Sequence, residues 1–215
     1  MAARKPRYWK SLQLHKGHIV SAHDKSPWTV GEWREVPAPV KECEGLNCCE
    51  YIVDAMRYVN MEVLAEVEID GKRITGDDKI TVQRMRIIRA WHWTREDTVL
   101  LVAYETKFYL EYLKKESRLN KIHSKKEIEF AEMLIENPTY ENMVEVMVTL
   151  FGYSRFLLSG GFWSYAGAAG VGNLHAYHDA SDSFRHFGAR LEFRADFFKK
   201  IQEWIVKHTT DMQVM

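Results

Sequence analysis

The chain has 215 residues, of which 46% are hydrophobic and 28% are charged, and this composition is typical of a globular protein that buries its own core. Thirty Lys and Arg residues balance thirty Asp and Glu residues, so net charge does not indicate nucleic-acid binding and the composition argues against disorder. No apolar segment approaches the ~20 residues that span a bilayer, and the basic start of the chain lacks the apolar stretch of a secretory signal.

These features predict a soluble cytoplasmic protein that does not associate with membranes. An odd number of cysteines, three, also fits a reducing compartment better than a disulfide framework. Aromatic residues make up 13% of the chain, and aromatic side chains are favoured both in cores and at interfaces. We therefore expect a protein partner or self-association.

The first 93 residues predict a β-rich module with one short helix. Leu12-x-Leu14 and His18-Ile19-Val20 flank a turn at Lys16-Gly17, which indicates a hairpin. Helical spacing within residues 50–59 predicts the helix. Alternating patterns within residues 61–93 predict two long antiparallel strands, one with Glu side chains and one with Arg side chains that would pair across them.

Residues 94–215 predict a helical region. Thr94 to Asp97 and Ser124 to Glu127 are spaced as capping boxes. Asn137-Pro138 is expected to end one helix and open the next, with Asn137 as the cap and Pro138 in the first turn. The fold class is therefore α+β, with a small, mainly antiparallel sheet and one helix (1–93) followed by a helical bundle (94–215).

The pattern of residues 174–206 predicts an amphipathic helix with imidazole and carboxylate groups on one side. Such groups can bind a divalent metal or act in acid–base catalysis, whereas the polar side of any surface helix also faces water. The candidate metal ligands are His175, His178, Asp179, Asp182 and His186.

Two shorter groups of residues are candidates for other chemistry. Cys43, Cys48 and Cys49 are thiols that could bind zinc, but their spacing favours structural packing. Glu66-Val67-Glu68 places two carboxylates on one face of a strand, as in paired-glutamate sites that transfer groups from NAD, although pairing with arginines explains them as well.

The front of the chain resembles a family of uncharacterised proteins from phages and bacteria. The motifs that carry the resemblance run from Trp28 through Gly31-Glu32-Trp33, Cys43-x-Gly45, Val67-Glu68-x-x-Gly71 and Asp78-Lys79 to Arg86-Ile87-Ile88-Arg89. The family pattern Cys-x-x-Gly-x-His-x-Cys is shorter in this chain, and Asn47 stands where it has histidine.

The resemblance implies an accessory protein of a phage or another mobile element. It brings no established activity and no cofactor. A β-rich module of this kind is loosely similar to ADP-ribosyltransferase-like folds, which leaves an NAD-dependent enzyme as an alternative, with Glu66, Glu68 and His23 as its catalytic residues. The leading prediction is a non-catalytic protein that acts by protein binding or assembly, and a metal protein is the third.

Overall fold

The computed structural model describes residues 7–56, 62–76, 79–115, 117, 119–149, 191–212 and 214–215. The chain divides into two compact units, Met1–Trp93 with Gln202–Met215, and Thr94–Ile201. They are called the sheet unit and the helical unit below. The α+β class predicted from the sequence is confirmed, and the last residues of the chain are grouped with the sheet rather than with the helices.

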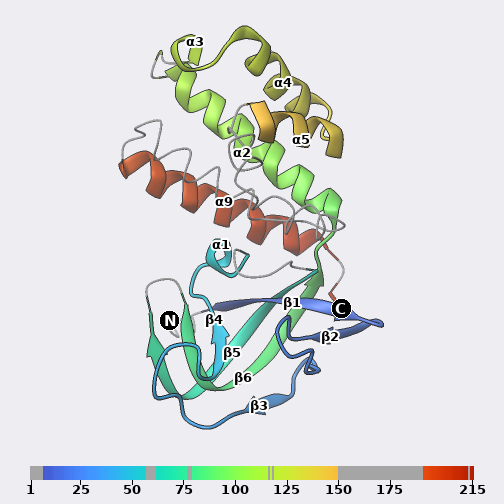
Figure 1. The fold of residues 1–215 in the computed structure, drawn as a ribbon, viewed down its shortest axis with the longest axis vertical. Helices are drawn as coiled ribbons and strands as arrows, with labels where there is room; N and C mark the ends of the chain where they lie inside the picture. The colour runs from blue at the N-terminus through green and yellow to red at the C-terminus, as the bar shows by residue number, and fades with distance from the viewer. Residues whose placement is uncertain are drawn as a thin grey trace. The chain divides into compact units, whose positions relative to one another are not determined.

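The sheet unit is built on a six-stranded antiparallel sheet (Figure 1). Its strand order is β2-β1-β5-β6-β3, and β4 also pairs with β6. The strands are β1 (Tyr8–His15), β2 (His18–Val20), β3 (Trp33–Glu35), β4 (Leu46–Cys48), β5 (Val63–Thr75) and β6 (Ile80–His92). Because β3 and β4 pair with different stretches of β6, both short strands lie along the same long strand.

The predicted pair of long strands is confirmed as β5 and β6, and the charged side chains face one another as expected. The register sets Glu66 opposite Arg89 and Glu68 opposite Arg86. The register shifts after Glu66 and again after Asp70. Such irregularities increase the local twist, and Figure 1 shows both strands strongly curled.

The predicted hairpin at the front of the chain is also confirmed. β1 and β2 pair from Gln13 to His15, and Lys16 and Gly17 form the connection between them. Both of these residues have positive φ, 52° and 80°, as the two-residue turns preferred in hairpins require.

One face of the sheet carries a hydrophobic core to which β1, β5 and β6 contribute alternate residues. From β1, Tyr8 and Leu12 belong to this core. Because successive side chains of a strand point to opposite faces, Lys10 lies on the same inward side between them. The buried partners from the other two strands include Val63, Ala65, Val67, Val82, Met85 and Ile87.

The C-terminal residues complete the sheet unit beside α1 (Ile52–Ala55). The backbone N–H of Met215 donates to the carbonyl of Ala90, and the Ile52 N–H donates to the side chain of Gln202. The His208 ring meets Trp93 edge to face. These contacts account for the grouping of the end of α9 (Leu191–Asp211) with the sheet.

The helical unit contains α2 (Arg95–Lys115), α3 (Leu119–Ile122), α4 (Lys125–Glu136) and α5 (Tyr140–Thr149) among its described residues. Both predicted capping boxes are present, since Thr94 exchanges hydrogen bonds with Asp97 and Ser124 does so with Glu127. The expected cap at Asn137 was wrong for α5: the hydroxyl of Thr139 accepts the hydrogen bond from the Asn142 N–H instead.

None of the described helices has the length and apolar character needed to cross a membrane.

Candidate ligand-binding cavity

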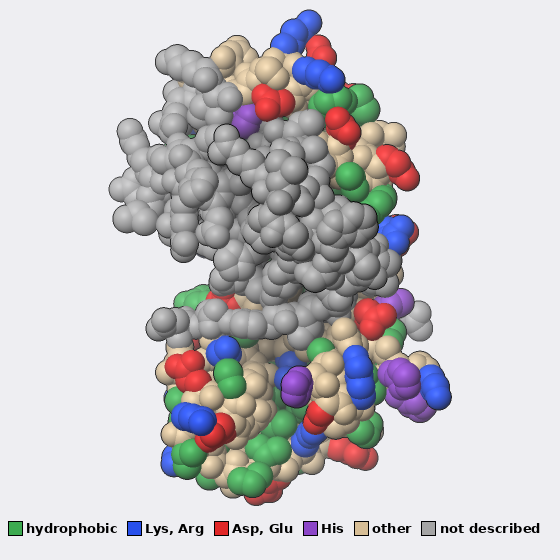
Figure 2. Space-filling view, viewed as in Figure 1, with side chains coloured by type: hydrophobic (Ala, Val, Ile, Leu, Met, Phe, Trp, Pro, Cys, Tyr) green, Lys and Arg blue, Asp and Glu red, His purple; other side chains and the backbone are tan. Residues whose placement is uncertain are grey.

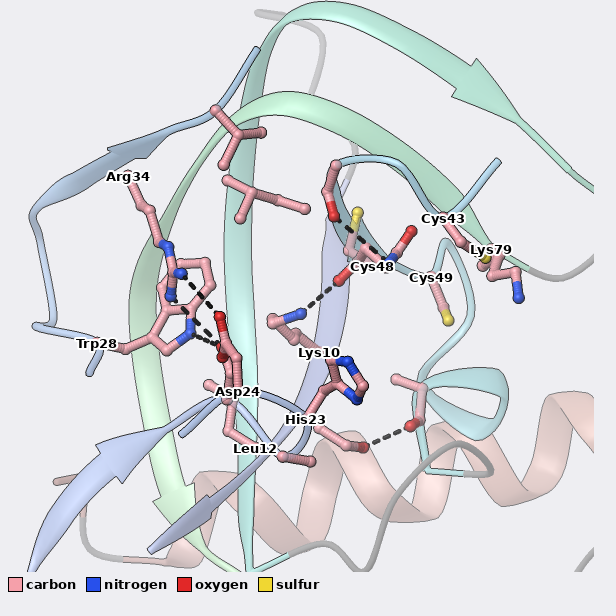
Figure 3. A pocket seen from close by; sticks show the side chains of 18 of the residues that line it. Lys10, Leu12, His23, Asp24, Trp28, Arg34, Cys43, Cys48, Cys49 and Lys79 are labelled. Atoms are coloured by element: carbon pink, nitrogen blue, oxygen red, sulfur yellow. Dashed lines mark hydrogen bonds and ion pairs between the residues drawn. The ribbon is translucent and has the colours of Figure 1, made fainter. Parts of the chain in front are cut away.

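The sheet unit contains a cavity of about 630 Å³ that opens beside β1 and β4 (Figure 3). Its walls come from β1, from the loop that carries Ser21 to Asp24, from Trp28 and Arg34, and from the segment between Cys43 and Cys49. The short strands and loops of the sheet unit thus surround Lys10, the charged residue on the inward side of β1.

Lys10 is a charged residue of the cavity wall whose pKa is strongly lowered. Its Nζ donates a 2.7 Å hydrogen bond to the backbone carbonyl of Asn47 and lies 5.5 Å from the centre of the Trp28 ring. The pKa of Lys10 is lowered to about 8: burial is the main cause and the charge of Arg34 adds to it, while Cys48, Cys49 and Asp24 act in the opposite direction. An ammonium has three N–H donors, and one of them bonds to a described residue.

A second cation, the guanidinium of Arg34, contacts the ring of Trp28. The guanidinium carbon of Arg34 lies 5.0 Å from the centre of the Trp28 ring. The indole N–H of Trp28 donates to the hydroxyl of Ser21 at 2.8 Å, and Arg34 reaches that hydroxyl at 3.4 Å. Two positive groups therefore lie within 6 Å of the centre of one buried aromatic ring.

The carboxylate of Asp24 is committed to other partners than Lys10. It accepts hydrogen bonds from the hydroxyl and the backbone N–H of Ser26, at 2.6 and 3.1 Å, and these bonds lower the pKa of Asp24 to about 2. Arg34 lies 3.6 Å away as an ion pair. Asp24 is thus ionised at neutral pH and partly balances Arg34.

The opposite wall holds the carbonyl of Asn47 in place. The side chain of Asn47 accepts a 2.7 Å hydrogen bond from the hydroxyl of Thr81, which itself accepts one from the N–H of Cys43. A Cβ at Gly45 would lie 2.8 Å from the carbonyl oxygen of Val82, so this close approach to β6 requires glycine. The side chain of Asn47 therefore has a structural role in this chain.

The cysteines do not form a metal site in the described part of the chain. Cys48 and Cys49 are buried and Cys43 is exposed. Burial raises the pKa of Cys48 to about 12, so it is a neutral thiol at physiological pH and a poor metal ligand. Among the residues that the structure describes, no group of three or more His, Cys, Asp or Glu side chains is placed to hold a metal ion.

The residues predicted for NAD chemistry lie in different places. His23 lines the cavity and points into it (Figure 3). Glu66 accepts a hydrogen bond from Arg89 at 3.0 Å and Glu68 accepts one from Arg86 at 2.8 Å, and neither glutamate lines the cavity. The structure does not bring the three together, and their catalytic role stays a prediction. The predicted metal ligands from His175 to His186 lie outside the described residues.

Sequence reasoning missed Lys10 and Arg34, which are the two cations that contact the Trp28 ring in the cavity. A usable signal existed for Lys10, because Tyr8, Lys10 and Leu12 alternate along a strand and set a charge at an inward position. No comparable signal marks Arg34, since its place beside Trp28 depends on the path of the loop between them.

Comparison with known families adds one match. Residues 20–100 match the family described as a domain of unknown function, DUF7666. The predicted resemblance to an uncharacterised domain family is confirmed, and the match includes Trp28, Arg34 and Asn47 but not β1 with Lys10. No curated protein and no solved structure was found to match the chain.

Proposed function

We propose that the cavity of the sheet unit binds a small anionic group, a carboxylate or a phosphate, and that the chain works by binding rather than by catalysis. The observation that carries the proposal is the ammonium of Lys10. Its partners among the described residues are a backbone carbonyl and an aromatic ring, and no carboxylate contacts it.

Removal of an ammonium from water is unfavourable unless a counter-charge or several hydrogen bonds replace the water. The lowered pKa of Lys10 expresses this cost. An anion that enters the cavity would accept hydrogen bonds from the remaining donors of Lys10 and supply the missing counter-charge. Binding of the anion therefore relieves an unfavourable state that the fold already contains.

Arg34 supports the same ligand class. Its guanidinium shares the Trp28 ring with Lys10, and a planar fork of N–H donors matches a carboxylate or a phosphate. A guanidinium has five N–H donors, so Arg34 keeps donors for a second anion beside its ion pair with Asp24 at 3.6 Å and its hydrogen bond to Ser21. We assign Lys10 and Arg34 as the two groups that hold the ligand.

The geometry favours binding over group transfer from NAD. Glu66 and Glu68 are each held by an arginine on the neighbouring strand, away from the cavity that contains His23.

The wider role that we propose is that of an accessory protein encoded by a phage or another mobile element, which acts in the cytoplasm through a protein partner or self-association. The aromatic-rich composition and the match to DUF7666 support it. Visible charged side chains of both signs are interspersed on the sheet unit (Figure 2), as expected of a surface that does not rely on bulk electrostatic attraction.

Thermal unfolding in inorganic phosphate at pH 7 tests the proposed site. A ligand at 100 times its dissociation constant stabilises the folded state by about 2.7 kcal/mol. We expect phosphate to raise the unfolding temperature above that in sodium chloride of equal ionic strength, and Lys10→Met to weaken phosphate binding at least tenfold.

The matched control is Lys72→Met, which makes the same substitution at an exposed lysine of β5 that does not line the cavity. This variant should respond to phosphate as the unaltered chain does. An equal response to phosphate and chloride, or equal weakening in both variants, contradicts the proposal.

A further inference from the structure

We propose that Lys10 captures anionic aldehydes or ketones by forming a reversible imine inside the cavity. This inference rests on the proposed function, because the anionic group of the carbonyl compound would be held by Arg34 while its carbonyl carbon meets the amine of Lys10. Lys10 would then bind its ligand through a covalent bond and not only through its charge.

The position of the amine carries the inference. Lys10 projects from the inward side of β1 into a cavity of about 630 Å³, large enough for a small organic molecule. In Figure 3 the Lys10 amine lies between Trp28 on one side and Cys48 and Cys49 on the other. Its hydrogen bond to the Asn47 carbonyl fixes the end of the flexible side chain. A lysine held at one point loses less conformational freedom when it forms a covalent bond.

The acidity of the amine supports the same chemistry. A lysine attacks a carbonyl only as the neutral amine, and desolvation is a known means of activating it. With a pKa of about 8, roughly one Lys10 amine in ten is neutral at pH 7. For an ordinary lysine the fraction is below about one in a thousand.

The reaction balances without an oxidant or a reductant. The nitrogen lone pair of the neutral amine forms a bond to the carbonyl carbon, and the carbonyl oxygen takes up a proton to give a carbinolamine. That hydroxyl leaves as water with a second proton while the nitrogen loses its hydrogens, and a C=N bond replaces the C=O bond. Hydrolysis reverses every step. His23 points into the same cavity and is the side chain that would carry the proton to the leaving hydroxyl.

The thiol of Cys48 does not compete for the carbonyl compound. Cys48 is the thiol nearest in chain to the Asn47 carbonyl that binds Lys10, and its pKa of about 12 keeps it protonated. Its hydrogen bond to the carbonyl of Ile80, at 3.8 Å, directs it toward β6. The amine of Lys10 is therefore a better nucleophile than the thiol of Cys48.

Borohydride trapping of the full chain tests the inference directly. The chain is incubated at pH 7 with less than one equivalent of pyridoxal 5′-phosphate, reduced with borohydride, and mapped by peptide mass spectrometry. We expect one reduced adduct, at Lys10, with at least tenfold greater occupancy than at any other lysine. Excess inorganic phosphate should reduce this labelling, and pyridoxal without its phosphate should label Lys10 at least fivefold less.

Two variants separate the covalent step from anion binding. Lys10→Arg keeps a cation in the cavity but has no amine that forms a stable imine, so it should still be stabilised by phosphate and lose the adduct. Lys72→Met removes an exposed lysine of the same unit and should leave the Lys10 adduct unchanged. The adduct map of the unaltered chain decides the question even if Lys10→Arg fails to fold.

The failures of the two proposals differ in their results. Stabilisation by phosphate without a preferred adduct at Lys10 overturns the imine and leaves the anion site intact. Equal labelling of Lys10 by both aldehydes, without protection by phosphate, overturns the anion site and, with it, the selectivity for anionic carbonyl compounds. Labelling spread over exposed lysines overturns the covalent site altogether.

Discussion

The sheet unit contains two groups of charged side chains that differ in how their charges are balanced. Along β5 and β6, Glu66 faces Arg89 and Glu68 faces Arg86, and hydrogen bonds join both pairs. In the cavity, Lys10 meets a backbone carbonyl and the Trp28 ring. In the first group every glutamate is paired with an arginine of the neighbouring strand. In the second group, the ammonium of Lys10 contacts no carboxylate among the described residues.

This difference separates structural charges from those available to a ligand. A salt bridge whose partners already satisfy one another gains nothing from a ligand and contributes to strand pairing. An ammonium that is desolvated without a counter-ion remains unfavourable until an anion arrives. The charges that stand out in the sequence are therefore the structural ones, and we propose that the charge available to a ligand is that of Lys10 on β1, together with Arg34.

The largest expected effect on stability comes from breaking the more buried of the two ion pairs between β5 and β6, called the Glu–Arg ladder below. The Glu66 side chain is 11% exposed and is held by Arg89 and by Arg7. Since hydrogen bonds to charged groups contribute about 1.5–3 kcal/mol, and Arg89 can be rehydrated, Glu66→Gln should lower the free energy of unfolding by roughly 1–2 kcal/mol. Chemical denaturation measures this, and phosphate binding should not change.

Glu68→Gln is the matched control, because its side chain is 25% exposed and its partner Arg86 is still more open to solvent. Pairs of this kind contribute about 0–1 kcal/mol. A loss of phosphate affinity in Glu66→Gln, with Glu68→Gln unaffected, would show that the ladder and the cavity are not independent.

The fold could be predicted where the pattern is local and repeated. Alternation in β5 and β6 and the capping boxes of Thr94 and Ser124 gave elements that the structure confirms. The cap of α5 was mispredicted because Thr139 lies closer to its first turn than Asn137 and offers the same kind of acceptor. The return of the C-terminus to Ala90 could not be predicted, because it is a contact between residues far apart in the chain.

The site was less predictable, since it depends on which charge lacks a partner. His23 lines the cavity, but the sequence pattern groups it with Glu66 and Glu68, which resemble a catalytic pair because both are acidic and lie two residues apart on a strand. The alternative prediction for the two glutamates was pairing with arginines, and the structure shows that pairing. That Lys10 would have no carboxylate beside it follows from the position of Asp24, which Ser26 holds toward Arg34.

A smaller effect is expected from the one carboxylate that competes for Arg34. Asp24→Asn keeps an oxygen for the hydrogen bonds from Ser26 but removes the negative charge that balances Arg34. We expect phosphate to bind about two- to fivefold more tightly, as exposed ion pairs of this kind contribute less than about 1 kcal/mol. Titration calorimetry measures the change. Glu32→Gln, at an exposed loop residue outside the cavity, should leave affinity unaltered, and weaker binding in Asp24→Asn would contradict the assignment of Arg34.

The most direct test of the central claim is a pH titration of Lys10 followed by nuclear magnetic resonance of its side chain, with and without inorganic phosphate. Because burial disfavours the charged form, the free protein should lose the Lys10 proton around pH 8, well below the value of about 10.4 for an ordinary lysine. A bound anion favours the charged form, so phosphate should move the midpoint of Lys10 upward. A Lys10 midpoint at about 10.4 that does not respond to phosphate would contradict the account.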